Sequence, residues 1–393
     1  MNQSALIITS TLVTGAVGAL FLEGMDFVGH AFAAQPLLMA TLPLGAVLSN
    51  RLYTKLDSAS DGGTHAAILA AQDGKPAAPS GMAPLIFVST LLTHLGGGSA
   101  GREGTALQLG AGITALVAKV TRCRAVAGGL ATRCGLAAGF GAVFGTPATA
   151  AVFALEMCAG RLSLRDAAWV SAAGWGGHAV ATLCGANHGR PFHPPVLNSL
   201  NLEALGGLAT LSLACGLLTG WFQRGLFFLR SFGRQVSSDW TTALAATALL
   251  AALSIAVPNG LSYCGLGATS MTEGAISIQS MLSEGIAAPF AWLWKTVFTL
   301  ITLGAGMRGG EVTPLFFIGA SLGLHLASIG LPTAGIAGPV GLCLAFAAGL
   351  RAPLAATILG FELFGWETGI AVALSAHLST LVTKTITSRK SRS

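Results

Sequence analysis

The sequence predicts an all-α polytopic membrane protein with discontinuous helices, and its composition is the first observation that points there. Hydrophobic residues make up 53% of the 393 residues and charged residues only 9%, against about 25% charged in soluble domains. Mean hydropathy is +0.71. The 53 glycines are about twice the usual share of 7% or so, as expected where membrane helices pack closely or break. So few charges cannot cover a soluble globule, which excludes a soluble enzyme, a disordered chain and a nucleic-acid-binding protein.

The apolar segments, the second observation, fall into two lengths. Crossing a bilayer takes about 20 apolar residues, and runs of this kind are expected at 5–24, 33–50, 164–184, 205–230, 240–257, 287–304 and 366–384. Glycine, proline or charge interrupts shorter runs at 82–95, 104–119, 125–143, 147–158, 313–328, 335–350 and 352–364. Irregular backbone at membrane depth persists only where it is buried in protein or lines a cavity. The pattern therefore favours a transporter with broken helices around a polar site.

An internal repeat is the third observation. The motif GREGT at 101–105 recurs as GGEVT at 309–313, and the pattern P-x-x-A-x-x-x-x-x-E occurs at 147–156 and again at 353–362. Apolar composition alone does not place prolines and glutamates in register. We therefore expect two homologous membrane halves in inverted orientation, 1–190 and 191–384, followed by a short basic cytoplasmic tail at 385–393.

Glu103 is the foremost candidate for proton chemistry. It follows a glycine-rich run and opens an apolar helix, and an ionisable residue inside a membrane is functional by default. The N–H groups and dipole of a glycine-led helix start form an anion site without a fixed cation. A carboxylate there can occupy the anion position and swing away when protonated. The alternative is a first-turn carboxylate that stabilises the helix, with Arg102 as its partner.

The second half repeats this arrangement. Thr313 can donate its hydroxyl to an anion, or it can serve as an N-cap. Glu311 can be a second proton carrier or the partner of Arg308.

A third glycine-led helix start, DGGTHAAILA at 61–70, places Thr64 and His65 at its mouth. A lone histidine is more often structural than a ligand. Glu156 and Glu362 end their helical segments symmetrically, and for them we favour structural roles.

At these motifs the chain resembles the CLC family of chloride channels and proton-coupled anion antiporters, over about residues 5–384. GSAGREGT is the most specific part. The resemblance implies a homodimer with one anion pathway per subunit, antiparallel halves, and helix N-termini that meet the anion near the midplane. It makes Glu103 the gating and proton-transfer glutamate. The anion-binding residues expected with it are Gly101, Arg102, Gly104, Thr105, Thr64, His65, Gly310, Glu311, Val312 and Thr313.

Within the family, the threonine after GREG and the motif GGEVTP resemble the fluoride/proton antiporter branch. In that branch Glu311 and Thr313 would help fluoride recognition or coupling. Met157 stands where many chloride/proton antiporters carry an internal proton-transfer glutamate, which also fits the fluoride branch.

We therefore predict a fluoride/proton antiporter that exports fluoride, integral to the bacterial inner membrane. The alternative is a chloride channel or chloride/proton antiporter of the same family. Expected partners are a small inorganic anion (fluoride or chloride), protons, membrane lipid and a second copy of the chain, and the small residues of 170–186 would allow close helix contact. We expect no cofactor, metal site, enzymatic activity or nucleic-acid partner, because the histidines lack ligand spacing and no nucleophile–base constellation occurs.

Overall fold

The structure, a computed structural model, describes residues 2–72, 75–123, 129–157, 163–188, 201–236, 239–270, 274–285, 288–333 and 335–388. Over these ranges the chain is helical, with no strand beyond a single antiparallel bridge between Gly101 and Gly310. This agrees with the predicted all-α fold. The predicted boundary between residues 190 and 191 lies outside the described residues. Of the predicted tail at 385–393, the first four residues continue the last helix and the remainder lies outside the described residues.

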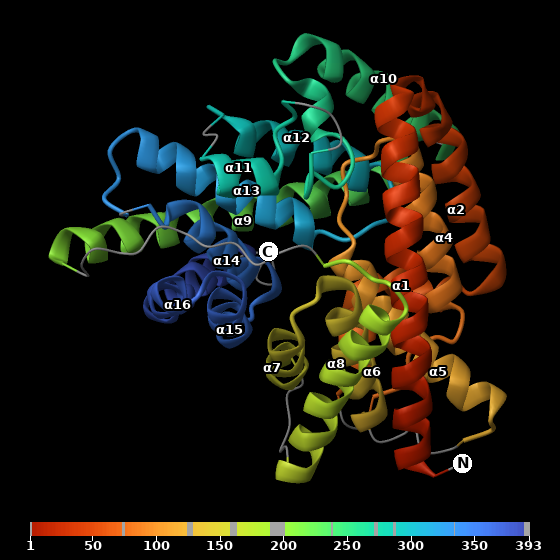
Figure 1. Cartoon of the computed structure of the whole chain (residues 1–393). Helices are drawn as coiled ribbons and strands as arrows, with labels where there is room; N and C mark the ends of the chain where they lie inside the picture. Colours follow the sequence, from red (N-terminus) through yellow and green to blue (C-terminus); the bar gives the residue numbers. More distant parts are fainter. Residues whose placement is uncertain are drawn as a thin grey trace.

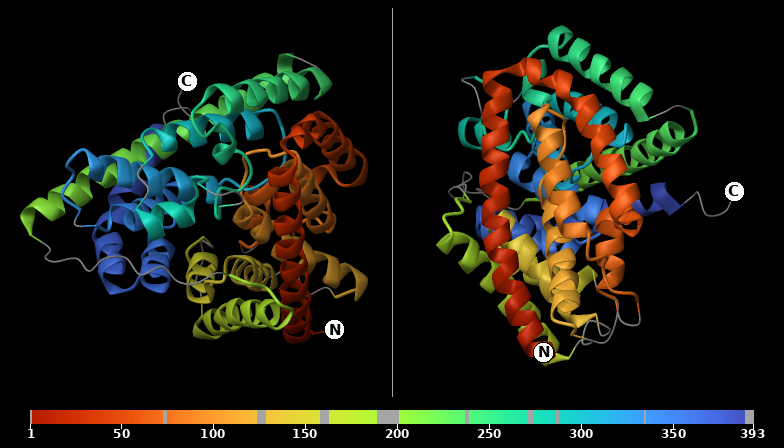
Figure 2. Two further views of the ribbon diagram at one scale, coloured as in Figure 1. Left: turned by 45° about the horizontal axis from the view of Figure 1, so that its top comes forward. Right: turned by 90° about the vertical axis from the view of Figure 1, so that its right-hand side faces the viewer.

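The helices of the first half follow one another with short breaks (Figure 1). They are α1 (Gln3–Ala34), η1 (Pro36–Thr41), α2 (Leu42–Leu56), η2 (Ser58–Gly62), α3 (Gly63–Ala70), α4 (Met82–Leu95), α5 (Glu103–Val120), α6 (Leu130–Phe144), α7 (Pro147–Met157) and α8 (Leu164–Leu183). In Figure 2, α4 lies between α1 and α2, and it contacts both.

The helices of the second half lie mostly on the other side of the molecule in Figure 1. They are α9 (Leu202–Val236), α10 (Asp239–Ala256), η4 (Gly260–Tyr263), α11 (Ile278–Glu284), α12 (Ala291–Gly304), α13 (Val312–Ser328), α14 (Ala337–Leu350), α15 (Pro353–Phe364) and α16 (Trp366–Ser388). The two halves meet through contacts of α7 with α15, of α2 with α10 and of α5 with α13.

By length and composition, four of the described helices can cross a membrane: α1, α9, α10 and α16. Three predicted spans, 33–50, 164–184 and 287–304, do not correspond to any of these four helices. The run 33–50 is divided at Pro36, where α1 has ended and η1 begins, because proline cannot donate to the preceding turn and restricts the residue before it. The run 287–304 is shortened, since α12 begins only at Ala291.

Glycine lets the helix backbones that carry the repeated motifs touch. A Cβ on Gly110 of α5 would lie 1.9 Å from the Gly135 carbonyl oxygen of α6, and a Cβ on Gly319 of α13 would lie 2.2 Å from the Gly341 carbonyl oxygen of α14. Contacts this close exist only without side chains. They hold α5 and α13 firmly, and both helices begin at a predicted site residue.

The small residues of 170–186 are used in the same way within the chain. A Cβ on Gly177 of α8 would lie 2.3 Å from the Ala138 carbonyl oxygen of α6, and a Cβ on Gly141 would lie 2.4 Å from the Gly174 carbonyl oxygen. This face of α8 therefore packs against α6 of the same subunit.

Glu156 and Glu362 cap each other's helices. The Glu156 carboxylate accepts two backbone N–H groups from the first turn of α15, at 2.9 and 2.8 Å. The Glu362 carboxylate accepts two from the first turn of α7, at 3.1 and 2.9 Å, and the Thr149 hydroxyl at 2.7 Å. Carboxylates at helix starts are favoured by the unpaired N–H groups and the dipole. These contacts support the structural roles predicted for both glutamates.

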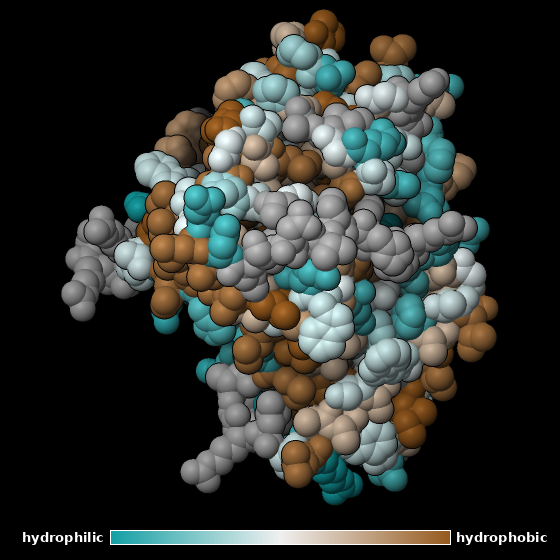
Figure 3. All heavy atoms as spheres, turned by 60° about the vertical axis from the view of Figure 1, so that its left-hand side comes forward, coloured by the Kyte–Doolittle hydropathy of each residue, from teal (hydrophilic) through white to brown (hydrophobic). Residues whose placement is uncertain are grey.

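The outside of the molecule carries many large apolar side chains, and Figure 3 shows apolar side chains over much of one face. On α9, Trp221, Phe227 and Phe228 are exposed, and so is Trp366 at the start of α16. Apolar surface of this extent suits lipid rather than water.

Candidate functional site: two paired helix starts and a charged cavity

The two repeated motifs meet each other at the starts of α5 and α13. The Gly101 N–H donates to the Gly310 carbonyl oxygen at 2.7 Å, and the Gly310 N–H donates back to the Gly101 carbonyl oxygen at 2.7 Å. Both glycines are needed, because a Cβ on Gly101 would lie 2.6 Å from the Thr313 hydroxyl oxygen and one on Gly310 would lie 2.8 Å from the Gly104 nitrogen. This exchange of hydrogen bonds brings residues about 210 positions apart into one site.

Glu103 is the first residue of α5 and is 1% exposed. Its carboxylate accepts a hydrogen bond from the hydroxyl of Thr313, which lies in the first turn of α13. The Thr313 oxygen in turn accepts the Arg102 N–H at 3.1 Å. Arg102 Nε lies 3.7 Å from the Glu103 carboxylate. The structure therefore brings together Gly101, Arg102, Glu103, Gly310 and Thr313.

Both helix starts are open to an acceptor. The N-cap residues of α5 and α13 are Arg102 and Glu311, and neither makes a side-chain cap hydrogen bond. Thr313 is therefore not the N-cap of α13. The first N–H groups of a helix have no partner within it, and together with the dipole they favour an anion. In this site the acceptor that is present is the carboxylate of Glu103. It stands where a small anion would accept the same hydroxyl donor.

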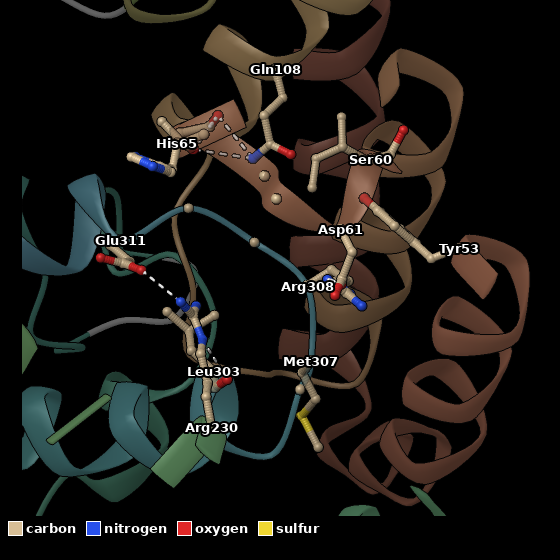
Figure 4. A pocket seen from close by; sticks show the side chains of 18 of the residues that line it. Tyr53, Ser60, Asp61, His65, Gln108, Arg230, Leu303, Met307, Arg308 and Glu311 are labelled. Carbon is tan, nitrogen blue, oxygen red and sulfur yellow. Dashed lines mark hydrogen bonds and ion pairs between the residues drawn. The ribbon is translucent and has the colours of Figure 1, made fainter. Parts of the chain in front are cut away.

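Glu311, the residue before α13, lies in the wall of a cavity. Arg308, its predicted alternative partner, pairs instead with Asp61 at 2.6 Å and lies over the ring of Tyr53 at 4.2 Å. Glu311 pairs with Arg230 of α9 at 3.2 Å. Figure 4 shows Glu311 turned toward Arg230, and Arg308 beside Asp61. Arg308 is paired with Asp61 of η2, and Glu311 is paired with Arg230, which is farther away in the sequence.

The cavity has a volume of about 910 Å³ and draws its lining from both halves. The third predicted helix start, α3, forms one wall. The Thr64 hydroxyl donates to the Gly104 carbonyl oxygen at 3.2 Å and accepts from Gln108 at 3.2 Å. His65 is exposed and lines the cavity. The α3 start therefore joins the site through the backbone of α5, and His65 belongs to the cavity wall rather than to the contact around Glu103.

The two remaining predicted residues, Thr105 and Val312, are both buried. The Thr105 hydroxyl is hydrogen-bonded to the Thr90 hydroxyl at 3.0 Å, so it holds α5 against α4. Val312 is the first residue of α13 and is 1% exposed. It also belongs to the wall of the cavity.

Sequence reasoning missed Arg230, Asp61 and Gln108. Arg230 lies in a cationic stretch of the sequence, which is typical of a helix end that reaches water. Asp61 directly precedes the glycine pair whose helix start indicated Thr64 as the site residue. A charge or amide within an apolar, glycine-broken segment was the available signal. Pairing across 81 positions, as between Arg230 and Glu311, leaves no spacing to recognise.

The fold and the site define a polytopic membrane protein with a buried carboxylate at paired, glycine-led helix starts. The chain belongs to the voltage-gated chloride channel family, whose model matches residues 45–384. A protein of Pseudomonas syringae pv. tomato, named chloride/fluoride channel protein, is 31% identical over 379 residues, which cover 94% of this chain and 82% of that protein. The family resemblance carried by GSAGREGT is thus confirmed.

Solved structures agree with this assignment. The crystal structure of a CLC-type fluoride/proton antiporter is 28% identical, with a TM-score of 0.87 over 98% of this chain and 96% of that one. A slow cyanobacterial Cl⁻/H⁺ antiporter shares the fold at 17% identity, with a TM-score of 0.78 over 99% of this chain and 96% of the other. The predicted CLC-like fold, with its broken helices, is confirmed.

Proposed function

We propose that this protein exports fluoride from a bacterial cell in exchange for protons. The observation that carries the proposal is the buried carboxylate of Glu103 at the start of α5, held by the hydroxyl of Thr313 from the other half of the chain. The likeness to the solved CLC-type fluoride/proton antiporter, over almost the whole of both chains, supports the choice of ion and of coupling.

The coupling follows from competition for one position. Ionised Glu103 occupies the place where an anion would meet the Thr313 hydroxyl and the N–H groups of two helix starts. When Glu103 takes up a proton it loses its charge, swings away and vacates the position. An anion then enters, and the carboxylate can return only after it has released its proton. Because one position serves both ligands, movement of the anion and movement of the proton are tied together.

The donors at the site suit fluoride. Fluoride is small and tightly hydrated, so it needs strong donors to replace its water, whereas chloride tolerates looser contacts. The donors are the N–H groups at the starts of α5 and α13, around residues 103–105 and 311–313, together with the Thr313 hydroxyl. Charge-assisted hydrogen bonds to such donors are roughly twice as strong as neutral ones.

Glu311 would serve protons or fluoride on the cavity side. It is partly exposed, it lies next to Gly310 of the pairing bridge, and its carboxylate is held by Arg230. A proton that enters the cavity can reach Glu311 directly. Glu103 is enclosed and must exchange protons by moving.

The inverted relation of the halves is part of the same proposal. In the reciprocal caps, Glu156 accepts the N–H groups of Leu354 and Ala355, and Glu362 accepts those of the equivalent residues Ala148 and Thr149. An approximate twofold axis between the halves would generate this exchange. Such an axis in the membrane plane is typical of inverted repeats.

Chloride transport is the second candidate, favoured by the family description and by the relative named chloride/fluoride channel protein. Purified protein in liposomes separates the two. Fluoride and chloride efflux are measured with ion-selective electrodes, with and without a pH gradient. Fluoride efflux that drives proton uptake uphill supports the antiporter. Chloride flux that equals or exceeds fluoride flux and ignores the pH gradient assigns a passive channel instead.

We also propose that the protein works as a homodimer of independent subunits. The support is the family and the exposed apolar side chains of α8, Trp175 and Leu183. The small-residue face of α8 does not contribute, because it packs on α6. Cross-linking in mild detergent should yield a dimer. A monomer at every protein concentration would contradict this.

A further inference from the structure

The middle of α12 carries a buried lysine that the proposed exchange does not use. Lys295 is completely buried, and its ammonium donates to the carbonyl oxygens of Tyr263 at 3.1 Å and Gly265 at 2.9 Å. It lies 5.5 Å from the centre of the Phe317 ring. Within the described ranges, no carboxylate lies within ion-pair distance of it. The partners that the described residues give the ammonium are therefore all neutral.

Two helices place this cation beyond Glu103 as seen from the cavity. Phe317 follows Thr313 by four residues on α13, so it lies on the same face about 6 Å further along the helix. Leu303, near the end of α12, lines the cavity, and Lys295 precedes it by eight residues, or about 12 Å. On the proposed path, an anion that leaves the cavity and passes Glu103 would come nearer to Lys295.

The ammonium is also fixed relative to the loop that leads to Glu103. The Gly265 N–H donates to the Gly97 carbonyl oxygen at 2.9 Å. One turn after Lys295, the Thr299 hydroxyl is hydrogen-bonded to the Ser99 hydroxyl at 2.9 Å. The charge and the glycine-rich loop therefore form one rigid unit.

An ionisable residue inside a membrane protein is costly and marks ion pathways, and a buried charge without a counter-ion is more costly still. A fixed charge in a low-dielectric wall attracts ions of opposite sign and repels those of like sign. We propose that Lys295 is the specificity-determining positive charge that draws a small inorganic anion past Glu103 and excludes cations. This inference deepens the proposed function and rests on it.

A purely structural role would need the hydrogen bonds of Lys295 but not its charge. The two can be separated, because an amide donates two N–H groups and carries no charge. Lys295→Gln keeps donors and loses the charge, Lys295→Arg keeps both, and Lys295→Met loses both. For an anion about 10 Å from the ammonium, with an effective dielectric constant of about 20, one unit charge changes the occupancy of the anion's site by roughly tenfold to twentyfold.

The experiment measures initial fluoride efflux from liposomes against fluoride concentration. We expect Lys295→Gln and Lys295→Met to lose about tenfold at low fluoride, and Lys295→Arg to stay within about threefold of the wild type. Exposed Lys119→Gln is the matched control and should change nothing. Wild-type flux in Lys295→Gln would overturn the proposal and leave Lys295 as a clamp on the segment around Gly265.

A second pair of variants leaves the lysine in place, in case the neutral ones do not fold. Cys264 is buried between the two residues whose carbonyls hold the ammonium. Cys264→Asp supplies a counter-charge and should lower flux about tenfold, while Cys264→Asn should not. Equal flux in the two variants contradicts the proposal. Wild-type protein without proton-coupled fluoride flux would instead count against the proposed function itself, since every variant is compared with that activity.

Discussion

Glu103 and Glu311 hold equivalent places in the two repeated motifs, each two residues before a threonine and within two residues of a glycine of the same bridge. Their surroundings differ. Glu103 is 1% exposed and accepts a hydroxyl from the other half, whereas the Glu311 side chain is 32% exposed and pairs with an arginine in the cavity wall. Equivalent sequence thus yields one carboxylate enclosed by the other half of the chain and one that is open to solvent. The repeat accounts for the presence of both glutamates, and the different packing around each one accounts for their different exposure and partners.

The largest effect should come from removing the enclosed carboxylate. Glu103→Gln should abolish proton coupling, because an amide keeps the carboxyl shape but cannot exchange a proton. Fluoride flux should slow or become passive. The measurement is proton uptake into liposomes driven by fluoride efflux.

Glu311→Gln is the comparison variant for this test. If the two glutamates differ as proposed, its coupling should fall less than that of Glu103→Gln. Should Glu103→Gln still pump protons against a gradient, Glu103 is not the carrier.

The bridge between the two motifs should be the next most sensitive feature. In Gly310→Ala the new methyl group would lie 2.8 Å from the Gly104 nitrogen, so backbone must move. We expect a loss of about 1–3 kcal/mol in stability, seen as a lower melting temperature in detergent. Gly206→Ala is the control, because nothing lies within 4 Å of a Cβ there. Equal melting temperatures for the two variants would show that the bridge tolerates a side chain.

The hydroxyl that joins the halves should set selectivity. Thr313→Val keeps the shape and deletes the donor, and losing a hydrogen bond to a charged group costs roughly 1–3 kcal/mol, or about one to two factors of ten in affinity. Fluoride binding should weaken more than chloride binding. Calorimetric titration of both anions checks this. An unchanged ratio would remove Thr313 from the site, and tighter chloride than fluoride binding in the wild type would favour the chloride alternative.

The smallest effect should come from the open ion pair. Arg230 and Glu311 are 42% and 32% exposed, and such pairs contribute about 0.2–1 kcal/mol. We expect Arg230→Gln to lower fluoride flux by roughly twofold to fivefold, through a less well placed Glu311. In the double variant with Glu311→Gln, the arginine substitution should add little. Fully additive losses would show that Arg230 acts on the anion independently.

Several features of the fold and the site follow from neighbouring residues. The broken apolar segments predicted discontinuous helices, and the glycines before Glu103 and Thr313 predicted helix starts suited to an anion. The span at 33–50 was mispredicted because apolar length outweighed Pro36. Small residues at 170–186 indicated close packing, but whether the partner is α6 or another subunit depends on the folded chain.

The sequence by itself determined that the chain lies in a membrane, that it has two related halves, and that Glu103 opens a helix. These properties depend on composition and on spacing along one segment. Only the tertiary structure decided that Thr313 donates to Glu103, that Arg230 rather than Arg308 holds Glu311, and that Lys295 has backbone carbonyls and no carboxylate as its partners among the described residues. Each of these is a pairing, or the lack of one, between segments far apart in the chain. Hydrogen bonds and ion pairs form with whatever group packing brings within about 3 Å, and no local pattern encodes that choice.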